Sequence, residues 1–243
     1  MKSPVNTFFD KVYVLSLPKD TAKRKTINKA LDRLNSDFEF FDGFDGTSSE
    51  YDREWQMYQS RLLVTKAELD MARKLIQSRG AWGCLYSYSA LLEKALTDQL
   101  ETFLVLEDDC LFSRGFHDKF EKFIIGLPEK WKLVLLGASQ HRWNPEEEIY
   151  ADYYHPTSMN TTGAFAVGYH HSILREILSE AQTKASAYDQ LALGNMYDRY
   201  RNKCFVAYPN LVIADVRESN IRDNRDLREH SIKMKWPIDQ FEL

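Results

Sequence analysis

Residues 102–110, TFLVLEDDC, combine a short apolar run with three consecutive acidic side chains. The run TFLVL is typical of a strand that is buried on both faces, as in a parallel sheet. Two similar strands are expected at 11–17 and 132–136, and they end in Ser16-Leu17-Pro18 and Gly137-Ala138-Ser139. In open α/β sheets, ligands bind at the carboxyl ends of strands. The acidic cluster therefore lies where a ligand site is expected.

The rest of the chain predicts a single α/β domain over 1–243, with a mostly parallel sheet flanked by helices. Further strands are expected at 38–41, in TTGAFAVGY and at 204–208. Helices are expected after Asp20 or Thr21 (with Ile27, Ala30, Leu31 and Leu34 inward), from a capping box at 65–68 to about 76, from Gly83, after His171, and at 186–200. Residues 47–64 are expected to be mainly loop, Gly80 to stop a helix, and 216–243 to be charged and irregular.

The bulk composition narrows the class of partner. The 243 residues include 32 basic and 36 acidic side chains, for a net charge of -4, whereas nucleic-acid-binding proteins usually carry a basic excess. The three cysteines form no CxxC pair, which favours buried thiols in a reducing compartment. No apolar stretch approaches the roughly 20 residues of a membrane span, and the N-terminus lacks the pattern of a signal peptide. We therefore expect a cytoplasmic protein with no nucleic-acid partner and no transmembrane segment.

The acidic triplet Glu107-Asp108-Asp109 predicts a metal site. Neighbouring carboxylates at the end of a buried strand repel one another and lose hydration, which is costly without a cation. A hard cation such as Mn²⁺ or Mg²⁺ takes oxygen ligands and bridges to a diphosphate. Alternate residues of an extended segment point the same way, so Glu107 and Asp109 can share one target. The alternative is an exposed acidic turn that caps the next helix.

Eight motifs occur in an order that resembles glycosyltransferase family 25, which includes bacterial lipopolysaccharide glycosyltransferases and procollagen galactosyltransferases. They are KVYVLSLPKDTAKRKTI, FEFFDGFDG, RGAWGCLYSYSALLEKAL, FLVLEDDCLF, WKLVLLGA, TTGAFAVGY, YDQLAL and YPNLVIADVRESNI, which together extend from about Val12 to Ile221. The resemblance implies a GT-A-type fold, a nucleotide-sugar donor (usually UDP-linked), Mn²⁺, glycan biosynthesis, a hydroxyl acceptor on a glycan, lipid or protein, and inversion at the anomeric carbon.

The resemblance also implies roles for individual residues. Glu107-Asp108-Asp109 is similar to a DXD motif, with Asp109 as the main metal ligand and Glu107 or Asp108 on the ribose or the metal. The residues implied in donor binding are Leu15, Ser16, Leu17, Arg24, Asp42 and Gly43, together with Glu107 and Asp108. Two alternatives remain open: a helical arginine is often simply solvated, and Asp42 with Asp45 suits a turn.

Asp189 and Gln190 resemble the family's Asp-Gln motif near the acceptor. An inverting transfer needs a base for the attacking hydroxyl, and Asp189 is the candidate. The alternative is structural, because Ser186 to Asp189 also reads as a capping box.

The chain departs from the family pattern at Ala81, where an acidic residue is common, and at Tyr88, where histidine is common. Tyr88 keeps a polar tip for positioning the acceptor or the donor sugar. The GT-A resemblance also implies a metal or phosphate contact from late in the chain. The candidates are Asp215, Asp223 and His230 for the metal and Arg217, Arg222 and Arg225 for the diphosphate, and the alternative is a solvated charged tail. His170-His171 opens a helix and needs no metal. Two other functions compete: a catalytically inactive nucleotide- or glycan-binding protein of the same fold, and metal-dependent phosphoryl transfer.

Overall fold

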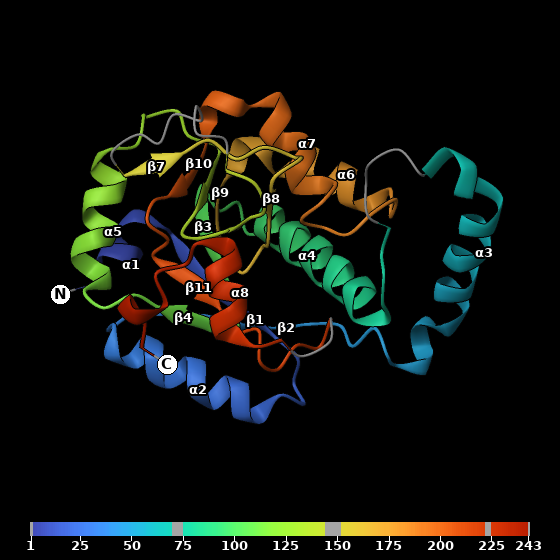
Figure 1. The fold of residues 1–243 in the computed structure, drawn as a ribbon, viewed down its shortest axis with the longest axis horizontal. Coiled ribbons are helices and arrows are strands. Elements are labelled where there is room, and N and C mark those ends of the chain that lie inside the picture. Colours follow the sequence, from blue (N-terminus) through green and yellow to red (C-terminus); the bar gives the residue numbers. More distant parts are fainter. Residues whose placement is uncertain (1, 70–74, 144–151, 222–224, 243) are drawn as a thin grey trace.

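A computed structural model describes residues 2–69, 75–143, 152–221 and 225–242 (Figure 1). The elements are α1 Pro4–Phe8, β1 Lys11–Ser16, α2 Thr21–Arg33, β2 Glu39–Asp42, η1 Ser49–Tyr51, α3 Asp52–Leu69, α4 Arg79–Thr97, β3 Thr102–Glu107, β4 Cys110–Phe112, α5 Phe116–Ile125, β5 Leu133–Leu135, β6 Ser139–Gln140, β7 Tyr153–Tyr154, β8 Thr161–Thr162, β9 Ala166–His170, η2 His171–Ile173, α6 Leu174–Gln182, α7 Ala192–Arg199, η3 Arg201–Lys203, β10 Cys204–Ala207, β11 Val212–Ala214, α8 Leu227–Met234 and η4 Ile238–Gln240. None of the helices in these ranges is long and apolar enough to cross a membrane.

The main sheet has seven strands in the order β2-β1-β3-β9-β5-β10-β7. Strands β2, β1, β3, β5 and β10 run in one direction, while β9 and β7 run in the other. The predicted α/β class with a mainly parallel sheet is therefore confirmed. The strands expected from apolar runs at 11–17, 102–106 and 132–136 all form, each within one residue of the predicted ends.

Side chains alternate across the sheet into two apolar clusters. In β1, Tyr13 and Leu15 belong to the cluster that includes side chains of α4, α6 and α7. Val12 and Val14 belong to the other cluster, which includes side chains of α2, α5 and α8. Figure 1 shows the central strands between these two sets of helices, with α4 beside α6. The sheet is thus covered on both faces, and its carboxyl-end edge stays accessible.

Residues 47–64 were expected to be loop with some helix, but they are mostly helical, because η1 spans Ser49–Tyr51 and α3 spans Asp52–Leu69. This helix lies at the margin of the molecule in Figure 1. Its contact with the body includes Trp55 and Tyr58, whose rings pack on Trp82 of α4. The segment is polar and weakly patterned, so no regular apolar stripe marks the helix in the sequence. The capping box expected at 65–68 lies inside α3 and does not start a helix.

Gly80 was expected to stop a helix, but it lies in the first turn of α4. Ser78 caps this helix, its hydroxyl accepting a hydrogen bond of 3.1 Å from the Ala81 N–H. A Cβ on Gly83 would lie 2.4 Å from the Phe44 carbonyl oxygen, and one on Gly46 would lie 1.8 Å from that of Arg79. The glycines therefore let the loop after β2 pack directly on the start of α4.

Two predictions for the second half need correction. The helix expected at 186–200 begins only at Ala192, and its N-terminal residue Leu191 makes no side-chain cap. The segment 216–243, expected to be irregular, contains α8, and it buries Trp236 and Phe241 in the second cluster.

Candidate active site

A cavity of about 270 Å³ opens at the carboxyl ends of β1 and β3. The residues singled out in the sequence that line it include Leu15, Ser16, Leu17, Gly43, Asp45, Gly80, Glu107, Asp108, Asp109, Ser139, Asp189 and His230. Residues from all three strand-end signatures are in this set, so the three strand ends face one cavity. That this cavity binds a ligand stays a prediction.

Glu107 ends β3 and is held by Tyr88 of α4. The Tyr88 hydroxyl lies 3.1 Å from Glu107 Oε1 and 2.7 Å from the Ala164 carbonyl oxygen, so two acceptors share its one proton. The ring of Tyr88 is fully buried and stacks on Tyr188, with centroids 4.1 Å apart and planes at 8°. The stack fixes the hydroxyl, and the hydroxyl fixes one oxygen of Glu107.

Asp108 and Asp109 make different contacts. The Ser16 hydroxyl donates a hydrogen bond of 2.5 Å to Asp108 Oδ2, which ties the triplet to the end of β1. Asp109 is anchored through its backbone, because its carbonyl accepts from the Asp215 N–H at 2.8 Å. Its Oδ1 is buried and has no hydrogen-bond partner among the described residues. A buried carboxylate oxygen without a donor is costly, so Asp109 has an acceptor free for a ligand.

Burial and mutual repulsion shape the electrostatics of the triplet. Burial is the main reason that the pKa of Glu107 is raised, and repulsion from Asp109 adds to it, while the Tyr88 hydrogen bond opposes it. The pKa of Asp109 is raised by burial and by repulsion from Asp108, against the attraction of Lys23. Burial also raises the pKa of Asp108, against the Ser16 hydrogen bond. A divalent cation would favour the charged form of all three carboxylates.

The triplet suits a cation that also takes ligands from a substrate. In the described part of the chain, the ligand atoms of its three carboxylates do not all lie within 4.8 Å of one another. Mg²⁺-type ions are usually bound through one or two carboxylates plus substrate phosphates, not by an all-protein cage. The unpartnered Oδ1 of Asp109 fits this mode, with Glu107 beside it.

Asp189 also lines the cavity. Its Oδ2 accepts a hydrogen bond of 2.9 Å from the Gly163 N–H, and no other donor to Asp189 is found among the described residues. Gly163 has φ +93°, a conformation that favours glycine. The capping box expected at 186–189 is therefore not formed: Asp189 instead joins the turn before β9, with one carboxylate oxygen fixed.

Four of the candidate residues do not line the cavity: Arg24, Asp42, Tyr88 and Gln190. Arg24 forms an ion pair with Asp42 and donates to the Ser16 carbonyl at 2.9 Å, so it braces the end of β1 from behind. Tyr88 lies behind Glu107. Roles for these four in binding donor or acceptor stay predictions.

Two lysines line the cavity and were missed in the sequence. Lys23 attracts Asp108 and Asp109, and its Nζ donates to the Glu218 carbonyl at 2.8 Å. Lys19 pairs with Asp45, another cavity residue. Lys23 comes directly before Arg24, so its side chain points about 100° away from that of Arg24 on α2. Arg24 was the candidate from the sequence, whereas the cation that lines the cavity is its neighbour Lys23.

The structure locates two of the three candidate metal ligands from late in the chain. His230 lines the cavity and lies 3.3 Å, Nδ1 to Nη1, from Arg225, which also lines it. Asp215 is paired with Arg217. Asp223 and Arg222 lie outside the described residues. A ligand role for any of them stays a prediction.

Comparison with known proteins identifies one matching family. The model of glycosyltransferase family 25 (LPS biosynthesis protein) matches residues 9–198. The inactive glycosyltransferase 25 family member 3 of Homo sapiens is 26% identical over 155 residues, which cover 60% of this chain and 24% of that protein. The Mus musculus protein of the same name is 24% identical over 217 residues, covering 82% of this chain and 34% of that protein. The chain thus spans about a quarter to a third of these relatives.

Solved structures show more distant likenesses. A glycosyltransferase involved in the glycosylation of the major capsid of PBCV-1 matches with a TM-score of 0.46 and 14% identity, covering 93% of this chain and 98% of that one. S. aureus TarS 1-349 in complex with UDP-GlcNAc matches with a TM-score of 0.43 and 14% identity, covering 92% of this chain and 65% of that one.

Proposed function

Because the chain belongs to glycosyltransferase family 25, we propose that it moves a sugar from a UDP-sugar donor to a hydroxyl acceptor, with a divalent metal and inversion at the anomeric carbon. The observation that carries this proposal is the cavity-lining acidic triplet, in which a buried Asp109 oxygen has no partner among the described residues. Such an arrangement is costly for a protein that never binds a cation there.

In this proposal, the end of β3 holds the diphosphate side of the donor. Asp109 and Glu107 hold the cation, which when bound supplies Lewis-acid neutralisation of the leaving diphosphate, worth several kcal/mol. Tyr88 keeps Glu107 in place, and Ser16 does the same for Asp108. Lys23 adds a positive charge on the same wall. The chain's own contribution is to orient these oxygens before the donor arrives.

Asp189 is the proposed general base. Its fixed Oδ2 leaves Oδ1 free to accept the proton of the acceptor hydroxyl. The acceptor oxygen then attacks the anomeric carbon as the bond from that carbon to the diphosphate oxygen breaks on the opposite face. The glycosidic bond forms, the proton resides on Asp189, and the nucleoside diphosphate leaves with the bonding electron pair.

The test is a comparison of Asp109→Asn and Asp189→Asn. UDP binding is measured by calorimetry with and without Mn²⁺, and hydrolysis of a panel of UDP-sugars reports turnover. We expect Asp109→Asn to lose the Mn²⁺-dependent part of UDP binding, and Asp189→Asn to keep it while turnover falls by about 10²–10⁴-fold, the usual contribution of a general base. Unchanged UDP binding and turnover in folded Asp109→Asn would refute the metal site.

A second candidate function is binding without catalysis. The two relatives reported above are named inactive, and this chain departs from the family pattern at Ala81 and Tyr88. Mn²⁺-dependent UDP binding with no turnover on any UDP-sugar, in the unmodified chain and with acceptor sugars present, would favour this alternative over the transferase.

A further inference from the structure

We propose that Glu101, His170 and His171 form a second metal site, for Zn²⁺ or a similar borderline cation, at the end of β3 opposite the acidic cavity. Six residues separate Glu101 from Glu107, so at about 3.3 Å per residue the two sites lie roughly 20 Å apart. The site is independent of the proposed transferase chemistry, and it departs from the sequence-based expectation that His170 and His171 need no metal.

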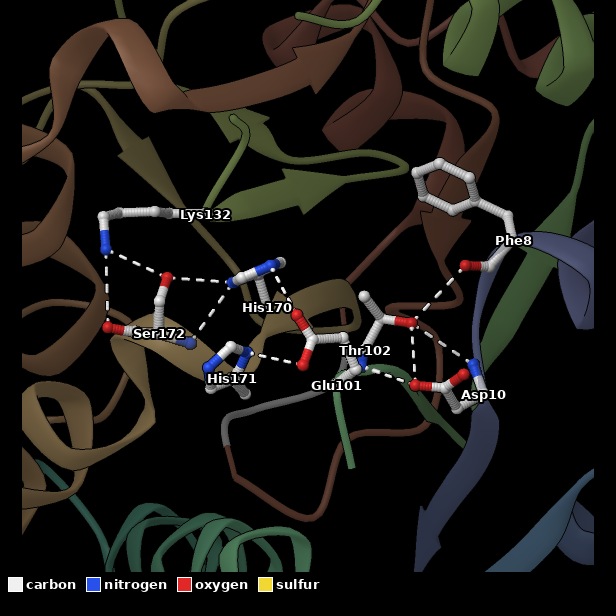
Figure 2. A network of polar contacts seen from close by, with 8 residues as sticks. All are labelled: Phe8, Asp10, Glu101, Thr102, Lys132, His170, His171 and Ser172. Atoms are coloured by element: carbon white, nitrogen blue, oxygen red, sulfur yellow. Dashed lines mark hydrogen bonds and ion pairs between the residues drawn. The ribbon is translucent and has the colours of Figure 1, made fainter. Parts of the chain in front are cut away.

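The strand register brings the three residues together. Thr102 of β3 pairs with His170 of β9, and just beyond this pair the His171 N–H donates to the Glu101 carbonyl at 2.7 Å. Figure 2 shows both imidazole rings directed at the Glu101 carboxylate. His170 Nε2 lies 3.2 Å from Oε1, and His171 Nδ1 lies 3.0 Å from Oε2. The ligand atoms of the three side chains all lie within 4.8 Å of one another.

These separations match a coordination sphere. Zinc binds histidine nitrogen at about 2.0–2.1 Å and carboxylate oxygen at about 2.0–2.2 Å, so ligand atoms at neighbouring tetrahedral corners lie roughly 3.3–3.5 Å apart. The nitrogen–oxygen distances are within a few tenths of an ångström of this value. Small side-chain rotations therefore suffice to admit an ion between the two rings and the carboxylate.

Ser172 provides the outer contact that a metal-bound histidine needs. Its hydroxyl lies 2.9 Å from His170 Nδ1, and Lys132 Nζ donates to the same oxygen at 3.0 Å (Figure 2). Without metal, Nδ1 accepts from the Ser172 backbone N–H at 3.2 Å, which places the imidazole proton on Nε2. With a metal on Nε2, the ring proton would reside on Nδ1 and be donated to the Ser172 hydroxyl, and the Ser172 N–H would give up its bond to Nδ1.

The ligand set selects the ion. Two imidazoles with one carboxylate suit zinc and the later first-row metals, whereas the acidic triplet offers only oxygen ligands and suits Mn²⁺ or Mg²⁺. The side chains of Glu101 and His171 are 63% and 51% exposed, so an ion can enter and a water can complete its coordination. The bound ion would tie the start of β3 to the junction between β9 and α6, and it would stabilise the folded chain.

The competing explanation is a metal-free hydrogen-bonded pair of histidines on one glutamate. Zinc uptake separates the two explanations. Glu101→Gln and His171→Gln weaken the hydrogen bonds under both explanations, but they remove a metal ligand only if the three residues form a metal site. Glu121→Gln is a matched control, since Glu121 is an exposed glutamate on another element, α5. Ser172→Ala tests the outer contact.

The experiment titrates the chelator-treated 243-residue chain with Zn²⁺ in competition with a chromophoric chelator, and it follows the melting temperature with and without Zn²⁺. The Asp109→Asn background removes uptake at the acidic cavity. We expect one zinc per chain in that background, weaker binding by more than about tenfold in Glu101→Gln and His171→Gln, and about 10–100-fold weaker binding in Ser172→Ala. Glu121→Gln should bind zinc as the parent does.

Two results would overturn the inference. One is zinc uptake in the Asp109→Asn background that Glu101→Gln and His171→Gln leave unchanged. The other is an Asp109→Asn chain that takes up no zinc and shows no zinc-dependent rise in melting temperature. Neither result bears on UDP binding with Mn²⁺, so failure here is distinguishable from failure of the proposed transferase function.

Discussion

Replacing Tyr88 by phenylalanine removes a single hydroxyl from behind the acidic triplet. The ring is fully buried, and its stack on Tyr188 at 4.1 Å needs no hydroxyl, so the packing should survive. Two acceptors lose their donor: the Ala164 carbonyl at 2.7 Å and Glu107 Oε1 at 3.1 Å. The substitution therefore tests whether Tyr88 holds Glu107 in position for metal binding.

The expected effects are large enough to measure. Leaving a buried acceptor without a donor costs about 1–3 kcal/mol of unfolding free energy. For a chain of this size each kcal/mol lowers the melting temperature by roughly 2–4 °C, so a fall of about 2–12 °C is expected. Loss of an outer contact to a metal ligand typically weakens metal binding by about 10–100-fold, and we expect this range for Mn²⁺ measured in the presence of UDP.

Tyr188→Phe is the matched control. Tyr188 is also buried, and its hydroxyl lies 3.0 Å from that of Tyr169, without a hydrogen bond to Glu107. We expect a similar loss of stability in both variants but weaker Mn²⁺ binding only in Tyr88→Phe, measured by calorimetry alongside thermal unfolding. Equal Mn²⁺ affinity in the two variants would refute the argument that Tyr88 acts through Glu107.

Two further predictions concern the cavity walls. Gly163 has φ +93°, and in Gly163→Ala the new Cβ would lie 2.8 Å from the Phe165 ring, so we expect a lower melting temperature. Because the amide that fixes Asp189 would shift, we also expect a lower turnover at unchanged UDP affinity. A turnover equal to that of the parent would contradict this. The Lys19 hydrogen bond is the largest cause that lowers the pKa of Asp45 from 3.8 to about 2. A carboxyl group whose pKa is lowered by folding stabilises the folded chain at pH values above its ordinary pKa, and this contribution is lost as pH falls from about 4 to about 2. Lys19→Met should therefore return the Asp45 pKa toward 3.8 in an NMR titration and reduce the pH dependence of stability in this range. An unmoved Asp45 pKa would show that Lys19 is not the cause.

The strands were predictable because each buried strand is a continuous apolar run. Residues 12–15 of β1 and 103–106 of β3 lie inside the sheet, where both faces are covered and the side chains are apolar. Helix α3 was not predictable because its sequence carries no 3.6-residue apolar stripe. Its described contacts include those of Trp55 and Tyr58 with Trp82 of α4, which depend on tertiary packing.

The candidate site was predictable only where its residues are adjacent in sequence. The triplet 107–109 is recognisable because three acidic residues directly follow an apolar strand. The Tyr88 hydroxyl reaches Glu107 across 19 positions, and Gly163 reaches Asp189 across 26. Such contacts depend on how α4 and the turn before β9 pack on the sheet, and no local pattern encodes that packing. The same holds for Glu101 and His170, which only the register of β3 on β9 brings together.

The two departures from the family pattern have different consequences for activity. Ala81 lies in the first turn of α4, where its N–H serves the Ser78 cap, and it does not line the cavity. Tyr88 instead touches Glu107 directly. Under the proposed mechanism, a change at Tyr88 that acts through Glu107 would alter Mn²⁺ affinity together with turnover. A chain that binds Mn²⁺ and UDP normally but does not turn over would instead place the defect outside this contact, for example at Tyr188 and Asp189, since Tyr88 also stacks on Tyr188.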